Sequence, residues 1–207
     1  MKKYFITSTG TEIGKTYYVC KLIAELKQQG KSIKALKPVI TGLDFNDLND
    51  CDSAKILETL DKPVTKDNIL DISPFYYNIP ASPDSAAILE GKEFLDYQKI
   101  KNHCQEFLNK EDSDYALIEG IGGVMVPLNQ DKTILDLMED LEIEVILIVG
   151  NYLGTRSHSL SAIESCRSRN IKINKIVIND YNSDGESADA VKASLANFCS
   201  EKIEMIS

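Results

Sequence analysis

Apolar residues along the chain form two kinds of pattern. Short runs rich in branched residues predict strands over 4–8, 32–39, 115–118, 144–149, 173–178 and 203–206. Apolar residues at helical spacing predict helices over 15–29, 52–60, 82–89, 96–110, 134–141, 157–169 and 187–199. The acidic segment 43–51 is predicted to be a loop, with Asp52 as the N-cap of the next helix. Segment 61–81, with its prolines and weak periodicity, is predicted to be irregular with short elements.

Strands that alternate with helices predict an α/β fold. Several of the predicted strands are apolar on both faces, which indicates a mostly parallel sheet covered by helices on both sides. Without repeats or a low-complexity linker, residues 1–207 are predicted to form a single domain. In such sheets ligands bind at the carboxyl ends of the strands. Polar clusters follow the predicted strands at 11–16, 37–41, 119–122, 151–157 and 179–180.

Composition and charge exclude several classes of protein. The net charge of −9 over 207 residues argues against a nucleic-acid-binding face, which needs clustered Lys and Arg. No stretch approaches the roughly 20 apolar residues that span a bilayer, and the N-terminal apolar run stops too early for a signal peptide. The five cysteines are scattered, with no CxxC pair. We therefore expect reduced thiols in a cytoplasmic protein rather than a zinc site or a disulfide framework.

The strongest chemical signal is Gly14-Lys15-Thr16, between the first predicted strand and the first predicted helix. This is the end of a Walker A phosphate loop, in which backbone N–H groups and the lysine bind phosphates and the threonine hydroxyl binds Mg²⁺. The usual spacing has glycine where this chain has Thr9. A chance tripeptide in a surface turn is the alternative, and the flanking strand and helix favour the phosphate loop.

Three further residues are candidates on the same rim. Glu119 ends an apolar run, where a metal-associated carboxylate is expected; the alternative is a solvated loop residue. Asp52 could be only a helix cap, and it competes with Asp44, Asp47 and Asp50. Lys37 ends the second predicted strand and could be an ordinary exposed lysine. Its position predicts a second cation that holds an anionic substrate against the γ-phosphate.

Six segments together resemble the dethiobiotin synthetase family. They occur in the family's order over most of the chain: Thr11 to Thr16, Lys37 to Gly42, Cys51 to Ala54, Glu119 to Gly123 with Val126-Pro127-Leu128, Leu153-Gly154, and Asn179-Asp180. The resemblance implies a P-loop NTPase-like fold. It also implies ATP- and Mg²⁺-dependent ring closure of 7,8-diaminopelargonic acid with CO₂, which yields dethiobiotin, ADP and phosphate through a carbamate and a carbamic–phosphoric anhydride. A cytoplasmic homodimer with the site at the interface is expected, without nucleic-acid or membrane partners.

The resemblance also assigns roles to residues. Lys15 and Lys37 would be catalytic, and the Mg²⁺ ligands would be Thr16, Asp52 and Glu119. The nucleotide would be bound by Glu12, Ile13, Gly14, Lys15, Thr16, Tyr17, Asp52, Glu119, Gly120, Ile121, Gly122, Asn179 and Asp180. The other substrate would be bound by Thr11, Thr41, Gly154, Thr155, Arg156 and Ser157. From the residues alone, 179–180 could be a plain turn and 154–157 a simple helix cap.

The chain departs from the family pattern at several places. Ser8 stands where the family usually has glycine, and Gly10 replaces a polar residue. The helix after Asn179-Asp180 lacks the tyrosine that some members use for the substrate tail. The Pro-containing C-terminal segment of many members is absent, so the nucleotide pocket is expected to be more open.

Two rival functions share this fold. A partition or positioning ATPase would carry a signature lysine at position 10, where this chain has glycine. A cobyrinate-type amidating ligase would need a fused glutamine-hydrolysing domain, for which 207 residues are too few.

Overall fold

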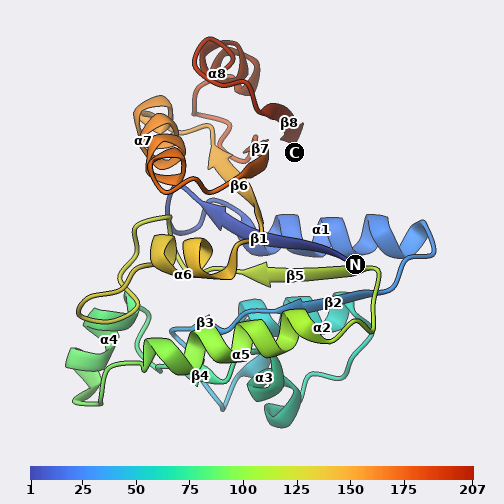
Figure 1. The fold of residues 1–207 in the computed structure, drawn as a ribbon, viewed down its shortest axis with the longest axis vertical. Coiled ribbons are helices and arrows are strands. Elements are labelled where there is room, and N and C mark those ends of the chain that lie inside the picture. Colours follow the sequence, from blue (N-terminus) through green and yellow to red (C-terminus); the bar gives the residue numbers. More distant parts are fainter.

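The central sheet has six strands, all parallel. The computed structural model describes residues 1–207 and gives the strand order β2-β5-β1-β6-β7-β8 (Figure 1). The strands are β1 (Lys2–Ser8), β2 (Ile33–Leu36), β5 (Tyr115–Glu119), β6 (Glu144–Gly150), β7 (Ile173–Asn179) and β8 (Lys202–Ile206). All of the sequence-predicted strand regions except the end of the second therefore lie in this sheet.

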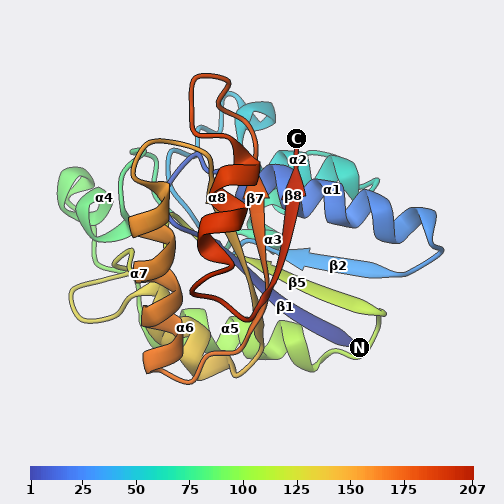
Figure 2. The same cartoon turned by 90° about the horizontal axis from the view of Figure 1, so that it is seen from above.

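Helices cover both faces of the sheet, as the sequence predicts (Figure 2). Helices α1 (Lys15–Gln28), α2 (Asp52–Thr59) and α3 (Lys66–Ile72) bury their apolar residues in one core. On the opposite face a second core takes in α5 (Tyr97–Asn109), α6 (Ile134–Leu141), α7 (Thr155–Ser168) and α8 (Ala188–Leu195). Helix α4 (Pro83–Glu90) contributes to a small third cluster. None of these helices is both long and apolar enough to cross a membrane.

Alternate residues of the central strands enter opposite cores. In β1, Phe5 belongs to one core and Ile6 to the other, and both are fully buried. In β5, Ile118 and Leu117 divide in the same way. Because side chains alternate along a strand, a sheet buried on both faces requires near-continuous apolar sequence, which is the pattern these strands show.

The second predicted strand is interrupted at Lys37. Strand β2 ends at Leu36, and β3 (Val39–Ile40) leaves the main sheet to pair with β4 (Phe75–Tyr76) in a separate two-stranded sheet. Pro38 lacks an N–H group for a sheet ladder. The backbone N–H of Lys37 donates instead to the carbonyl of Ile72, at 2.9 Å. The prediction of one continuous strand over 32–39 was wrong for this reason, whereas α3 and β4 are the short elements expected within 61–81.

The prediction that Asp52 caps its helix was also wrong. Cys51 is the N-cap residue of α2, and Asp52 is the first helical residue. The Asp52 carboxylate bonds to the Lys37 ammonium. A long-range ion pair has therefore replaced the local cap that the sequence suggested.

Candidate active site

The loop between β1 and α1 encloses the end of the Lys15 side chain. The Lys15 ammonium donates to the hydroxyl of Ser8 and to the carbonyl of Gly10, each at 3.2 Å. Gly14 has a φ of 95°, which favours glycine, and a Cβ there would lie 2.2 Å from Nδ2 of Asn179. The N–H groups of the first helical turn lack intrahelical partners and carry the positive end of the α1 dipole. This geometry supports the phosphate-loop prediction.

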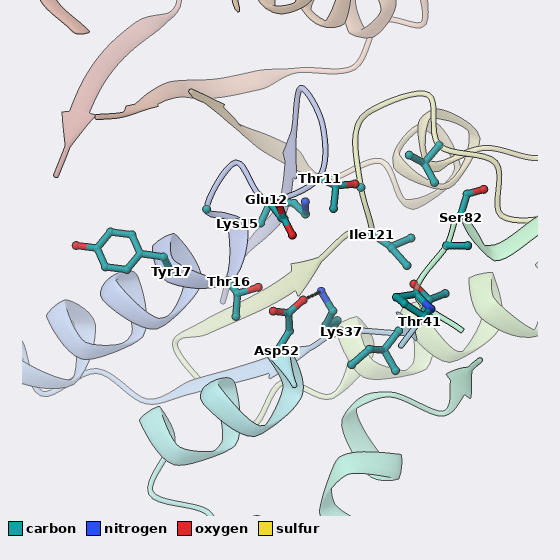
Figure 3. Close-up of a pocket in the computed structure, with 16 residues that line it drawn as sticks. Thr11, Glu12, Lys15, Thr16, Tyr17, Lys37, Thr41, Asp52, Ser82 and Ile121 are labelled. Carbon is teal, nitrogen blue, oxygen red and sulfur yellow. Dashed lines mark ion pairs between the residues drawn. The ribbon is translucent and has the colours of Figure 1, made fainter. Parts of the chain in front are cut away.

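A buried ion cluster lies beside this loop. The Lys37 ammonium is 2.6 Å from Oε1 of Glu119. It is also 2.8 Å from Oδ2 of Asp52, the ion pair marked in Figure 3. The Thr16 hydroxyl donates to the same Glu119 oxygen, at 2.8 Å. The side chain of Lys37 is 3% exposed and that of Glu119 is 0% exposed, whereas Asp52 is 42% exposed. Four residues predicted from separate segments are thus brought into one network.

The network keeps Lys37 charged. Burial alone would lower the pKa of Lys37, but the carboxylates of Glu119 and Asp52 outweigh it and raise that pKa above its ordinary value. Burial likewise opposes ionisation of Asp52, yet Lys37 lowers the pKa of Asp52. Burial, and then the charge of Lys37, lower the pKa of Lys15 to about 8. The two lysines therefore differ: the pKa of Lys37 is raised, whereas the pKa of Lys15 is lowered.

An open cleft of about 570 Å³ connects the loop and the ion cluster, a volume typical of small-molecule sites. It is lined by eleven of the predicted site residues: Thr11, Glu12, Gly14, Lys15, Thr16, Tyr17, Lys37, Thr41, Asp52, Ile121 and Gly122. The sequence did not identify five further lining residues: Ile40, Pro80, Ala81, Ser82 and Val126. Residues 80–82 precede α4 and reach the cleft only because the small β3–β4 sheet carries that segment there. No local pattern marks this placement.

Other predicted residues lie behind or beside the cleft. Asn179 is 5% exposed, and its amide donates to the carbonyl of Ile13 at 3.0 Å. Asp180 lines a neighbouring hollow of about 650 Å³, where its carboxylate accepts from the amide of Asn151 at 2.6 Å. Gly120 donates its N–H to the carbonyl of Ile6, at the end of β1. These residues connect the end of β7, the loop and the end of β5.

The segment 154–157 does not line the cleft. Gly154 precedes α7, and the buried Thr155 donates its hydroxyl to the carbonyl of Gly150. The guanidinium of Arg156 forms an ion pair with Glu186. Within this chain, Arg156 and Ser157 are therefore not brought to the phosphate loop.

The fold and site define the class of protein. A parallel sheet with a phosphate loop between β1 and α1 is a P-loop NTPase fold, and solved structures agree. The chain resembles MinD in the MinC:MinD cell division protein complex of Aquifex aeolicus, with a TM-score of 0.60 and 16% identity over 100% of this chain and 81% of that one. It also resembles the hydrogenase maturation factor HypB of Archaeoglobus fulgidus, with a TM-score of 0.57 and 16% identity over the same shares. At this identity the likeness shows the fold alone.

Sequence comparison gives the family. A family model described as an AAA domain matches residues 2–205. An ATP-dependent dethiobiotin synthetase of Caulobacter vibrioides is 41% identical over 180 residues, which cover 87% of this chain and 80% of the relative. Another from Phenylobacterium zucineum is 39% identical over 189 residues, covering 91% and 80%. The chain belongs to the family of ATP-dependent dethiobiotin synthetases and is an enzyme of that ligase class, which confirms the resemblance found in the sequence.

The lowered pKa of Lys15 predicts a pH dependence of nucleotide binding. A polyphosphate favours the charged form, so the pKa of Lys15 rises on binding, and binding takes up a proton above pH 8. The Kd for ADP, measured by calorimetry in EDTA, should be flat below pH 8. It should then rise by up to about tenfold per pH unit. Lys15→Arg stays protonated and should abolish the slope. An equal slope in both proteins would contradict the assignment.

The burial of Glu119 predicts a large stability effect. Lys37→Ala leaves the Glu119 carboxylate without a cation and should lower the free energy of unfolding by about 3–5 kcal/mol in urea titrations. In the double variant Lys37→Ala/Glu119→Gln, a neutral amide replaces that carboxylate, and part of the lost stability should return. Lys27→Ala, which removes an exposed pair with Asp61, is the control and should cost no more than about 1 kcal/mol. Equal losses for Lys27→Ala and Lys37→Ala would show that the cluster contributes no more than a surface pair.

Proposed function

We propose that this enzyme converts 7,8-diaminopelargonic acid, CO₂ and ATP into dethiobiotin, ADP and phosphate. The observation that carries the proposal is the buried Lys37 ammonium, paired with Glu119 and Asp52 at the edge of the phosphate-loop cleft. A carbamate is an anion that must approach the polyanionic end of ATP. Concentrated positive charge is needed to offset that repulsion. The curated relatives carry the name of this activity.

The proposed chemistry needs positioning and charge rather than a protein nucleophile. One substrate amine attacks CO₂ and loses a proton, which forms the carbamate. A carbamate oxygen then attacks the γ-phosphorus, the bond to ADP breaks, and a carbamic–phosphoric anhydride forms. The second amine attacks the carbonyl carbon of this anhydride, loses a proton, closes the ring and expels phosphate. Lys15 would hold the phosphates and Lys37 the carbamate, while Thr11 and Thr41 would contact the substrate from the cleft wall.

The residues around the cluster fit a magnesium ion. Oε2 of Glu119 is buried without a hydrogen-bond partner, and Asp52 and Thr16 line the cleft beside it. Carboxylate and hydroxyl oxygens are the ligands that this hard cation takes. Thr16, Asp52 and Glu119 would hold Mg²⁺, which supplies charge neutralisation at the β- and γ-phosphates when bound.

The remaining nucleotide contacts follow from the two hollows. Residues 12–17 and 119–122 would surround the phosphates. Asp180, which lines the second hollow, and Asn179, which precedes it, would lie toward the base.

We further propose a cytoplasmic homodimer in which segment 154–157 of the partner subunit meets the substrate carboxylate. The N-terminus of α7 is suited to an anion. The pairing of Arg156 with Glu186 makes the backbone N–H groups, rather than the guanidinium, the main donors in this proposal.

The central test is product formation. Purified enzyme with bicarbonate and ATP–Mg²⁺ should release phosphate only when diaminopelargonate is present, with one dethiobiotin formed per phosphate by mass spectrometry. Withdrawal of Mg²⁺ with EDTA should stop both. Phosphate release that is indifferent to the diamine would refute the specific reaction.

Removing the Lys37 charge should separate binding from chemistry. Lys37→Ala should abolish dethiobiotin formation at a temperature where the variant is folded, while the Kd for ADP changes by less than about threefold, because Lys15 and the loop backbone still bind the phosphates. Lys34→Ala, on β2 three residues before Lys37 and paired with Asp112, should retain activity. Normal turnover by Lys37→Ala would disprove the role assigned to Lys37.

A further inference from the structure

Two buried serines hold the backbone of Lys37. Lys37 lies in the gap between β2 and β3, where its carbonyl has no strand partner. The hydroxyl of Ser73 donates to that carbonyl at 2.8 Å, and the hydroxyl of Ser53 lies 2.6 Å from Oγ of Ser73. Both serines are 0% exposed.

The direction of these hydrogen bonds is determined by the proton count. A serine hydroxyl has one proton and two lone pairs. Because Ser73 gives its proton to Lys37, Ser53 must donate to Ser73. The chain of bonds therefore runs from Ser53 to Ser73 to the Lys37 carbonyl. Each hydroxyl polarises the next, which strengthens the chain in the surrounding apolar core.

The two serines come from the ends of two helices that meet at Lys37. Ser53 follows Asp52 in the first turn of α2, so this turn contacts the Lys37 ammonium through Asp52 and reaches its carbonyl through Ser53 and Ser73. Ser73 follows the last residue of α3, and the carbonyl of Ile72 accepts the Lys37 N–H. Both backbone polar groups of Lys37 are thus held by the end of α3 rather than by a sheet.

We propose that Ser73, supported by Ser53, is a positioning residue that sets where the Lys37 ammonium lies in the cleft. The inference rests on the proposed role of Lys37. A long lysine side chain reaches a defined point only if its backbone is fixed. The strand break removes the ladder that would normally fix it, and the two hydroxyls take its place. Neither serine lines the cleft, and Ser73 acts through the Lys37 carbonyl to which it donates.

The test compares variants that lose similar packing or bonding but differ in their link to Lys37. Ser73→Ala should lower kcat for dethiobiotin formation about 10- to 100-fold, because small misplacements of a charge-bearing group are costly. The KM for ATP and the Kd for ADP should change by less than about twofold. Ser53→Ala leaves the Ser73 bond in place and should lower kcat by a smaller factor. Ser73→Thr retains the hydroxyl and should recover most of the loss.

Ile100→Val is the matched control. Ile100 is fully buried on α5 in the opposite core, and this change costs about as much stability as a lost hydrogen bond. It should leave kcat unchanged. If Ser73→Ala fails to fold, Ser53→Ala takes its place in the comparison with Ile100→Val. A kcat for the alanine variant equal to that of Ile100→Val would overturn the proposal. Normal turnover by Lys37→Ala would instead overturn the proposed function beneath it.

Discussion

The buried carboxylate of Glu119 lies at the end of β5, whose last four residues are buried, and an isolated charge there would be strongly unfavourable. The Lys37 ammonium compensates the Glu119 charge at 2.6 Å, and Asp52 of α2 forms a second ion pair with Lys37 at 2.8 Å. The ion cluster joins several elements that are far apart in the sequence. It lies where β2 runs beside β5, it connects the first turn of α2 to the sheet through Asp52, and its Glu119 oxygen also accepts from Thr16 of the phosphate loop. Lys37, which the proposed chemistry uses as a cation, is thus held in place by Glu119 and Asp52, the carboxylates proposed to bind the metal.

The sequence predicts the parts of this structure that depend on local pattern. Strands that are buried on both faces can be recognised by their continuous apolar runs. Gly14-Lys15-Thr16 directly marks the loop before α1. The site residues at the ends of β1, β2 and β5 could be listed from the rule that ligands meet the carboxyl ends of parallel strands. Lys37 and Glu119 meet in space as that rule requires.

The predictions that failed depend on contacts between distant residues. Asp52 has the local signature of a cap, but a lysine fifteen positions earlier takes its carboxylate. The strand break at Lys37 is stabilised by Ser73 and by the pairing of β3 with β4, from a segment with weak periodicity. The ion pair of Arg156 with Glu186, which no prediction concerned, is another contact of this kind. Such partners follow from topology and packing, which the local pattern does not contain.

The position of β1 has a mechanical consequence. This strand is hydrogen-bonded to β5 on one side and to β6 on the other. The ion cluster is carried by the β2–β5 side, and the hollow around Asp180 by the β6–β8 side, with the Asn179–Ile13 bond tying that side to the phosphate loop. A nucleotide that occupied both regions would extend across β1 and contact both sides of the sheet. Twisting of the two halves of the sheet about β1 would alter the distance between the ion cluster and the hollow around Asp180.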